Sequence, residues 1–129
     1  MQLRAHLAEV VVAAAVLLIA APSTATDTTT LLATLRQHSD EFERCFVEFE
    51  PTVPSSVTLA FLIDRDGYGV RASIVEGRVG LDSPGLCLVD QFMLRPGVRF
   101  DDPRLRGQRF RATFAFSPNA SPRLAITAR

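Results

Sequence analysis

The stretch VTLAFLIDRDGYGVRASIV, residues 57–75, decides the fold of this chain. It holds two runs in which apolar side chains alternate with polar or smaller ones, a period of two that is typical of half-buried strands. The apolar positions are Val57, Leu59, Phe61 and Ile63 in the first run and Val70, Ala72 and Ile74 in the second. A short segment rich in Asp and Gly joins the runs, so the stretch predicts a β-hairpin.

The joining segment DRDGYG invites comparison with a calcium loop. An EF-hand loop needs oxygen ligands at positions 1, 3 and 5, glycine at 6 and a bidentate glutamate at 12. Counted from Asp64, position 12 is Val75, and Glu76 falls one place too late. The flanks also have the period of strands instead of helices. We therefore expect Asp64 and Asp66 to form a turn, with no metal site.

Helices are predicted on either side of the hairpin. Apolar residues at intervals of three and four indicate an amphipathic helix from Leu31 to Phe49, which ends before Pro51 and Pro54. After the hairpin, GLDSPG at residues 80–85 is typical of a helix start. A second, shorter helix follows, with its apolar positions at Leu86, Val89, Phe92 and Met93.

A third strand is predicted near the end of the chain, where Phe110, Ala112, Phe114 and Phe116 alternate with Arg111, Thr113 and Ala115. The predicted fold class is α+β, a three-stranded antiparallel sheet covered on one face by two helices, in the order helix, strand, strand, helix, strand. This domain would span residues 26–117. Residues 118–129 are expected to be a flexible C-terminal tail.

The first 25 residues are predicted to be a secretory signal peptide. One arginine precedes the apolar run VVVAAAVLLIAA, and Ser23 and Ala25 then occupy the small-residue positions of a cleavage site. The run is shorter than the roughly 20 residues that span a bilayer. We expect cleavage after Ala25, no membrane span in the mature chain, and a periplasmic or secreted protein.

The chain has two cysteines, Cys45 and Cys87. An even number of cysteines in an exported chain predicts a disulfide bond, because the compartment is oxidising. The alternative is a pair of unpaired, buried thiols.

The formal net charge is zero, so the total charge indicates neither a nucleic-acid nor a membrane partner. The charges are nevertheless uneven, since eight acids and three arginines lie between residues 27 and 66 but five acids and ten arginines follow. A possible partner surface lies in the last part, at Arg104, Arg106, Arg109 and Arg111. Arg109 and Arg111 should project from the last strand on the face opposite its phenylalanines. They would bind an acidic partner or cell-wall groups, or pair with the acids of the first helix.

Catalytic groups are scarce. After signal cleavage His38 is the only histidine, and it lies on the apolar stripe of the first predicted helix. No serine occupies a Gly-x-Ser-x-Gly elbow, and one histidine with two cysteines makes a poor zinc site. We expect no cofactor and no enzymatic activity.

Four segments together resemble the AgmX/PglI C-terminal domain, a TonB C-terminal-like module of bacterial envelope proteins. They are FERCF (42–46), the hairpin stretch (57–75), GLCLVDQF (85–92) and RFRATFAF (109–116). The chain departs from the family pattern at PSSV (54–57) and LRPGVRF (94–100). The resemblance implies a small TonB-C-like domain without catalysis, in which Cys45 and Cys87 form a disulfide between the two helices.

The expected function is that of an exported, non-catalytic module that binds or scaffolds another protein of the cell envelope. The alternative is a small secreted inhibitor or ligand carrier. An exposed sheet edge would favour the first, because modules of this kind bind peptides by strand addition. A closed apolar cavity between sheet and helices would favour the second.

Overall fold

The computed structural model describes residues 28–94 and 96–129. The predicted signal peptide, residues 1–25, lies outside the described residues. Residues 28–37 are helical. The elements that follow are α2 (Ser39–Phe49), β1 (Ser55–Ile63), β2 (Gly69–Glu76), α3 (Pro84–Met93), the short 3-10 helix η1 (Pro103–Leu105), β3 (Arg109–Phe116) and β4 (Leu124–Ala128).

The protein is α+β, with the described strands joined in one antiparallel sheet in the order β2-β1-β3-β4. β1 and β2 form the predicted hairpin. The predicted third strand, β3, pairs with β1 along nearly the whole length of both strands. Leu59 lies opposite Ala112, and Phe61 lies opposite Phe110. Both strand predictions are confirmed. β3 is far from β1 in the sequence, and its pairing with β1 leaves β2 at one edge of the sheet.

The prediction of three strands and a flexible tail was wrong. Residues 124–128 form β4, which pairs with β3 through Phe114 opposite Ile126 and Phe116 opposite Leu124. Leu124 and Ile126 are 8% and 4% exposed, because they lie against the same apolar core as the phenylalanines of β3. Burying these two side chains offsets the loss of chain entropy that would otherwise leave the segment disordered.

The first predicted helix is two helical segments. The backbone N–H of His38 donates to the carbonyl of Leu35, three residues back, at 3.1 Å, and the helix resumes at Ser39. Leu31, Leu35 and Phe42 are nevertheless all fully buried. The break therefore changes the direction of the chain without removing the apolar stripe from the core.

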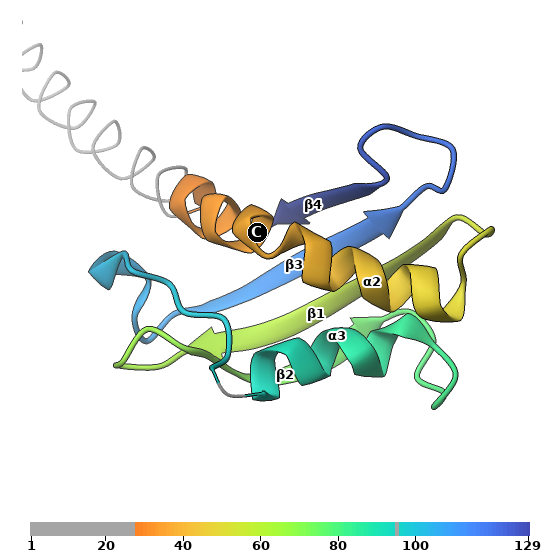
Figure 1. Cartoon of the computed structure of the whole chain (residues 1–129). Helices are drawn as coiled ribbons and strands as arrows, with labels where there is room; N and C mark the ends of the chain where they lie inside the picture. The colour runs from red at the N-terminus through yellow and green to blue at the C-terminus, as the bar shows by residue number, and fades with distance from the viewer. Residues whose placement is uncertain (1–27, 95) are drawn as a thin grey trace, which may run out of the picture.

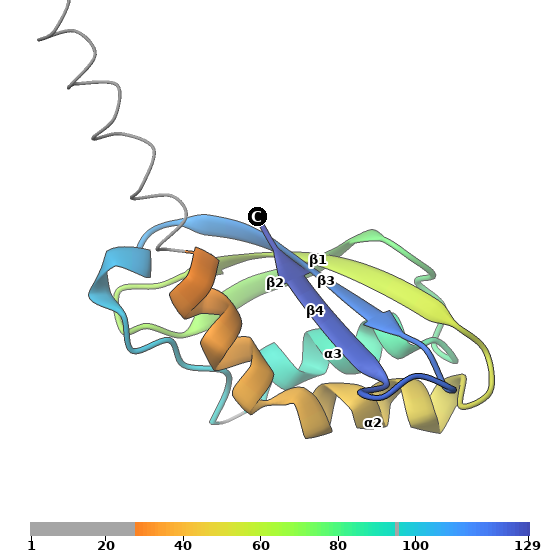
Figure 2. The same ribbon diagram turned by 90° about the horizontal axis from the view of Figure 1, so that it is seen from above.

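All the helices lie on one face of the sheet. Figure 1 shows α2 and α3 side by side in front of the strands, and Figure 2, turned by 90°, shows the helical layer below and the sheet above. Phenylalanines fill the space between the layers: the ring of Phe42 is 4.8 Å from Phe114 and 6.0 Å from Phe92, centre to centre. Phe46 stacks on Phe116 at 5.4 Å. The core thus belongs to one face of the sheet only.

The turn of the hairpin is held by Asp64. One of its carboxylate oxygens accepts hydrogen bonds from the backbone N–H groups of Asp66 and Tyr68, at 3.0 and 2.9 Å. Gly67 adopts a φ of +91°, and a Cβ atom there would lie 2.6 Å from the carbonyl oxygen of Phe100. The aspartate therefore acts as a turn former, as predicted.

Cys45 and Cys87 form a disulfide bond that joins α2 to α3, with 5.5 Å between their Cα atoms. Cys45 is fully buried, and Cys87 is partly exposed between the two helices. The alternative of two unpaired thiols is thereby excluded in this structure. The bond links the two helices that carry Phe42 and Phe92 into the core.

We expect reduction of the disulfide to lower the free energy of unfolding by about 4 kcal/mol, since it closes a long loop in the unfolded chain. Urea denaturation of residues 26–129, with and without reductant, measures the change. The variant Cys45→Ala/Cys87→Ala is the control, because reductant should leave its unfolding midpoint unchanged. Equal midpoints for the oxidised and reduced protein would contradict the prediction.

The variant Ile126→Ala tests β4. Removing a buried isoleucine side chain should destabilise the protein by about 2–4 kcal/mol. The neighbouring change Thr127→Ala, on the exposed side of the same strand, should alter stability by no more than about 0.5 kcal/mol. If both variants unfold at the urea concentration of the wild type, residues 124–128 do not form a packed strand in solution.

Candidate functional site

β4 is an uncharged strand at an edge of the sheet. Arg111 and Arg129 exchange both backbone hydrogen bonds at 2.9 Å, and the N–H of Ser117 donates to the carbonyl of Arg123 at 2.8 Å. Because amide directions alternate along a strand, residues 125 and 127 also face β3. The N–H and C=O groups of residues 124, 126 and 128 therefore point away from the sheet.

No other described element covers this edge. Figure 1 shows β4 as the outermost strand, and Figure 2 looks onto the same edge with nothing drawn in front of it. The sequence LAITA contains no proline and no charged residue, the two features that usually protect an edge strand from pairing. β4 is therefore open to a further strand.

The opposite edge, β2, is less suited to pairing. Its register with β1 shifts twice, between Thr58 and Leu59 and between Ala60 and Leu62. Arg71 in this strand adopts a φ of +54°, which is unusual for a residue other than glycine. Such irregularities twist an edge and interrupt its row of amides, so β2 carries the protection that β4 lacks.

The outer face of the sheet, opposite the helices, carries arginines among small residues. Arg109 and Arg111 are exposed on this face. The residues that alternate with them along β3 are buried on the inner face: Phe110, Ala112 and Phe114. The prediction that these two arginines lie opposite the phenylalanines is confirmed. Strands β1, β3 and β4 contain no acidic residue.

A shallow hollow, open to solvent, lies on this outer face where β3 and β4 run side by side. It is lined by Arg111, Thr113, Thr127, Ala128 and Arg129. Arg111 lies directly opposite Arg129, and Thr113 lies directly opposite Thr127. The hydroxyl of Thr113 is also within 2.8 Å of the hydroxyl of Thr58 on β1. Two guanidinium groups and two hydroxyls thus gather next to the open edge.

The other predicted arginines lie elsewhere. Arg104 is in η1, where its guanidinium donates to both carboxylate oxygens of Asp102 at 3.1 and 2.9 Å. Arg106 is exposed in the turn that follows η1. Of the four predicted positions, the structure therefore brings only Arg109 and Arg111 together on the sheet face. Arg129 and Thr127 were missed, because they belong to the segment expected to be flexible.

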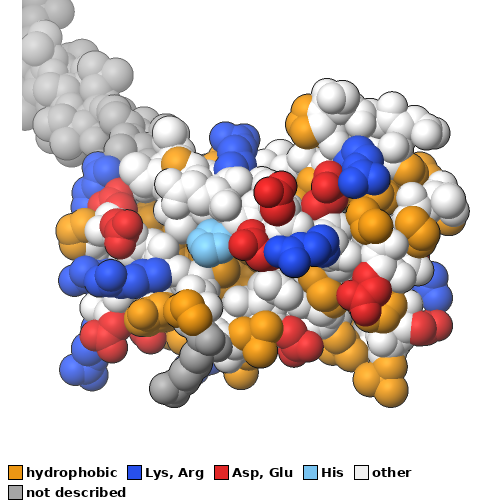
Figure 3. All heavy atoms as spheres, viewed as in Figure 1, with side chains coloured by type: hydrophobic (Ala, Val, Ile, Leu, Met, Phe, Trp, Pro, Cys, Tyr) orange, Lys and Arg blue, Asp and Glu red, His pale blue; other side chains and the backbone are white. Residues whose placement is uncertain are grey.

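Two arginines do pair with acids in or next to the first helix, but they are not the four predicted ones. Arg123 bonds to Glu43 of α2 at 3.2 Å, and Arg78 bonds to Glu50 at 2.9 Å. Figure 3 shows the helix-bearing face, on which basic and acidic side chains lie close together. Within the part of the chain that the structure describes, no Asp or Glu side chain lies within ion-pair distance of Arg109, Arg111 or Arg129.

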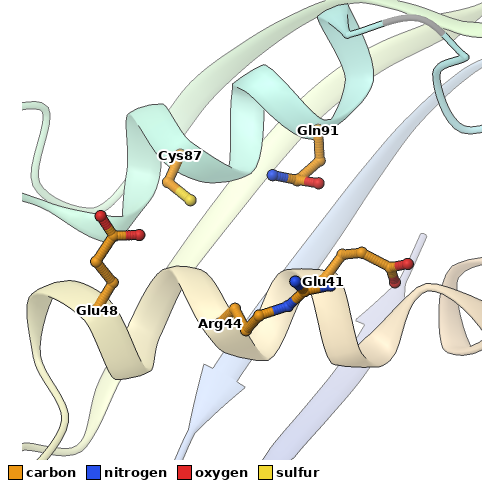
Figure 4. Close-up of a pocket in the computed structure, with 5 residues that line it drawn as sticks. All are labelled: Glu41, Arg44, Glu48, Cys87 and Gln91. Atoms are coloured by element: carbon orange, nitrogen blue, oxygen red, sulfur yellow. The ribbon is translucent and has the colours of Figure 1, made fainter.

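A second hollow lies in the groove between α2 and α3, beside the disulfide (Figure 4). Its lining side chains are Glu41, Arg44, Glu48, Cys87 and Gln91. It is open to solvent, most of its lining residues are charged or polar, and none of them belongs to the sheet. It therefore differs from the apolar cavity that a ligand carrier needs.

Comparison with protein-family models, curated proteins and solved structures gives no significant match. The resemblance to the AgmX/PglI C-terminal domain thus stays a prediction based on the four quoted segments.

The carboxylate of Asp102 accepts hydrogen bonds that we expect to make the fold sensitive to acid. The guanidinium of Arg104 and the backbone N–H of Arg104 donate to its carboxylate, as does the hydroxyl of Thr30 at 2.9 Å. Together they hold the pKa of Asp102 well below its ordinary value. A carboxylate whose pKa is lowered by folding stabilises the protein above its unfolded pKa of about 3.9, and this contribution is lost as the pH falls further.

We therefore expect Asp102→Asn to be less stable than the wild type at pH 7. The difference between the two proteins should shrink as the pH falls from about 4 towards 2. Urea midpoints measured across this range test the expectation. Asp101→Asn is the matched control. The Asp101 side chain is 91% exposed, and its ion pair with Arg99 is long, at 3.9 Å, and therefore weak. A constant difference between Asp102→Asn and wild type at all pH values would contradict the assigned role.

Proposed function

We propose that this protein is an exported, non-catalytic module that binds or scaffolds another protein of the cell envelope, and that the partner adds a strand to β4. The observation that carries the proposal is the open edge of β4, where the amide groups of residues 124, 126 and 128 point away from the sheet. Strand addition uses such amides for affinity and the alternating side chains for specificity.

β4, the strand to which the partner would pair, is short but packed against the core. Leu124 and Ile126 anchor β4 in the core, and the neighbouring strand supplies regular pairing along its length. Three outward-facing residues offer one donor and one acceptor each, and a hydrogen bond of this kind contributes a net of about 0.5–1.5 kcal/mol. An edge of this size suits a modest, reversible contact that side-chain interactions then make specific.

The proposed location is the periplasm or the extracellular space, which the disulfide between Cys45 and Cys87 supports. Within the described residues, no helix combines the length and the apolar character needed to cross a bilayer. We further propose a TonB-C-like relationship, supported by the order of helix, hairpin, helix and strand and by a disulfide that joins α2 to α3. β4 would then be an additional strand that this relationship does not account for.

The alternative, a small secreted inhibitor or ligand carrier, has less support. Between the helices and the sheet, the ring of Phe92 lies 6.0 Å from that of Phe42 and 4.9 Å from that of Phe61, centre to centre. Aromatic side chains thus occupy the space in which a carrier would hold an apolar ligand.

The variant Ala128→Pro tests the edge. Its N–H points away from the sheet, so proline at this position removes a donor that an added strand needs but costs the sheet no bond. In-cell cross-linking followed by mass spectrometry should capture envelope partners with the wild type and lose them with Ala128→Pro. Ala128→Val keeps the N–H and is the matched control. Equal capture by Ala128→Pro and the wild type, with both proteins folded, would contradict strand addition.

A further inference from the structure

The outer-face arginines next to β4 form an incomplete charge arrangement. Arg111 and Arg129 occupy a directly opposed pair of positions on adjacent strands, and like charges placed so are unfavourable. No acidic side chain on β1, β3 or β4 compensates them, and among the described residues neither guanidinium has an Asp or Glu partner. In a chain that ends at residue 129, the α-carboxylate of Arg129 offsets one of the two positive charges. An anion is the group that would complete this arrangement.

The chemistry of the hollow suits a carboxylate. A guanidinium presents several N–H donors in a planar fork that matches the two oxygens of a carboxylate. Thr113 and Thr127 line the same hollow, and the hydroxyl of Thr127 can add a further donor, whereas that of Thr113 is bonded to Thr58. Arg111, Thr113 and Thr127 lie on β3 and β4, and Arg129 directly follows β4; backbone bonds between these two segments fix the spacing of the four residues.

The hollow also adjoins the open edge. Thr127 and Arg129 belong to β4 or directly follow it, and their side chains are on the outer face. A strand added to β4 would place its own outer-face side chains beside them, since paired residues in a sheet have Cβ atoms about 4.5–5.5 Å apart. An acidic side chain at such a position would lie within reach of both Arg129 and Arg111.

We propose that the β4 edge selects an extended segment of a partner protein that carries Asp or Glu at its outer-face positions, bound through Arg129 and Arg111. This inference rests on the proposed strand addition and names the class of partner. On the inner face the added strand lies beside Leu124 and Ile126, both buried in the core. The preferred segment therefore alternates acidic and apolar residues.

A second copy of the chain fits the edge less well. A β4 strand from a second copy would bring the sequence LAITA, which contains no acidic residue. It would therefore leave Arg111 and Arg129 without a carboxylate partner. An acidic segment instead turns the same arginines into favourable contacts.

The experiment uses residues 26–129 and three synthetic seven-residue peptides in which Val alternates with Glu, Gln or Lys. Fluorescence anisotropy at low salt measures their dissociation constants. The Glu peptide should bind at least about tenfold more tightly than the Gln peptide, a difference that weakens as salt screens the charges. The Lys peptide should bind most weakly.

Variants locate the preference. Arg111→Gln/Arg129→Gln should bind the Glu and Gln peptides equally, and Arg111→Glu/Arg129→Glu should prefer the Lys peptide. Arg106→Gln is the matched control, because this arginine is exposed but lies in the turn after η1, and the variant should keep the wild-type preference. Ala128→Pro should bind none of the three peptides.

The outcomes separate this inference from the proposed function. If all three peptides bind equally and Ala128→Pro abolishes binding, strand addition stands and the acidic preference is overturned. A preference for Glu that Ala128→Pro leaves intact would overturn binding at the edge, since the acid would then bind the sheet face alone. If sedimentation shows a dimer that Ala128→Pro dissociates, the occupant is a second copy and the inference is overturned.

Discussion

The packing of Phe42 between α3 and the sheet is the interaction on which the rest of the structure depends. Its ring lies against Phe92 on one side and Phe114 on the other, so one side chain of α2 joins both helices to β3. The disulfide adds a covalent link between the same two helices. Because this core uses only one face of the sheet, the other face is left to solvent. The arginines and threonines on that outer face are therefore not required for packing.

The fold was predictable wherever a pattern continued over enough residues. Apolar residues recur at every second position from Val57 to Ile63 in β1 and from Phe110 to Phe116 in β3, and the prolines at 51 and 54 mark the end of the first helix. β4 has only five residues and follows the turn-forming segment SPNASP. Its alternation of Leu124 and Ile126 with small residues is too short to distinguish a strand from a tail. Only pairing with β3 makes burial of these two residues possible, and pairing is not a local property of the sequence.

The same limit applied to the candidate site. Alternation alone placed Arg109 and Arg111 on the face opposite the phenylalanines. Which side chain would lie beside Arg111 depended on the register of a strand that was not predicted, so Arg129 was missed. His38 shows the limit for helices, because the apolar stripe continues through it although the backbone hydrogen bonds are interrupted there. Sequence periods predict which face a residue occupies, whereas the neighbour of that residue is set by tertiary structure.

The difference between the two faces explains how unpaired arginines persist in a stable fold. On the helix-bearing side, Arg123 and Arg78 contact Glu43 and Glu50. On the outer face Arg111 and Arg129 are exposed to solvent. Two unit charges 4 Å apart in bulk water repel by only about 1 kcal/mol. A partner strand that excludes water from this face lowers the local dielectric constant. The repulsion between the two guanidinium groups then becomes stronger, and so does the attraction of each to a carboxylate between them. The arrangement thus tolerates solvent but discriminates between partners, since only an acidic segment removes the repulsion as it removes the water.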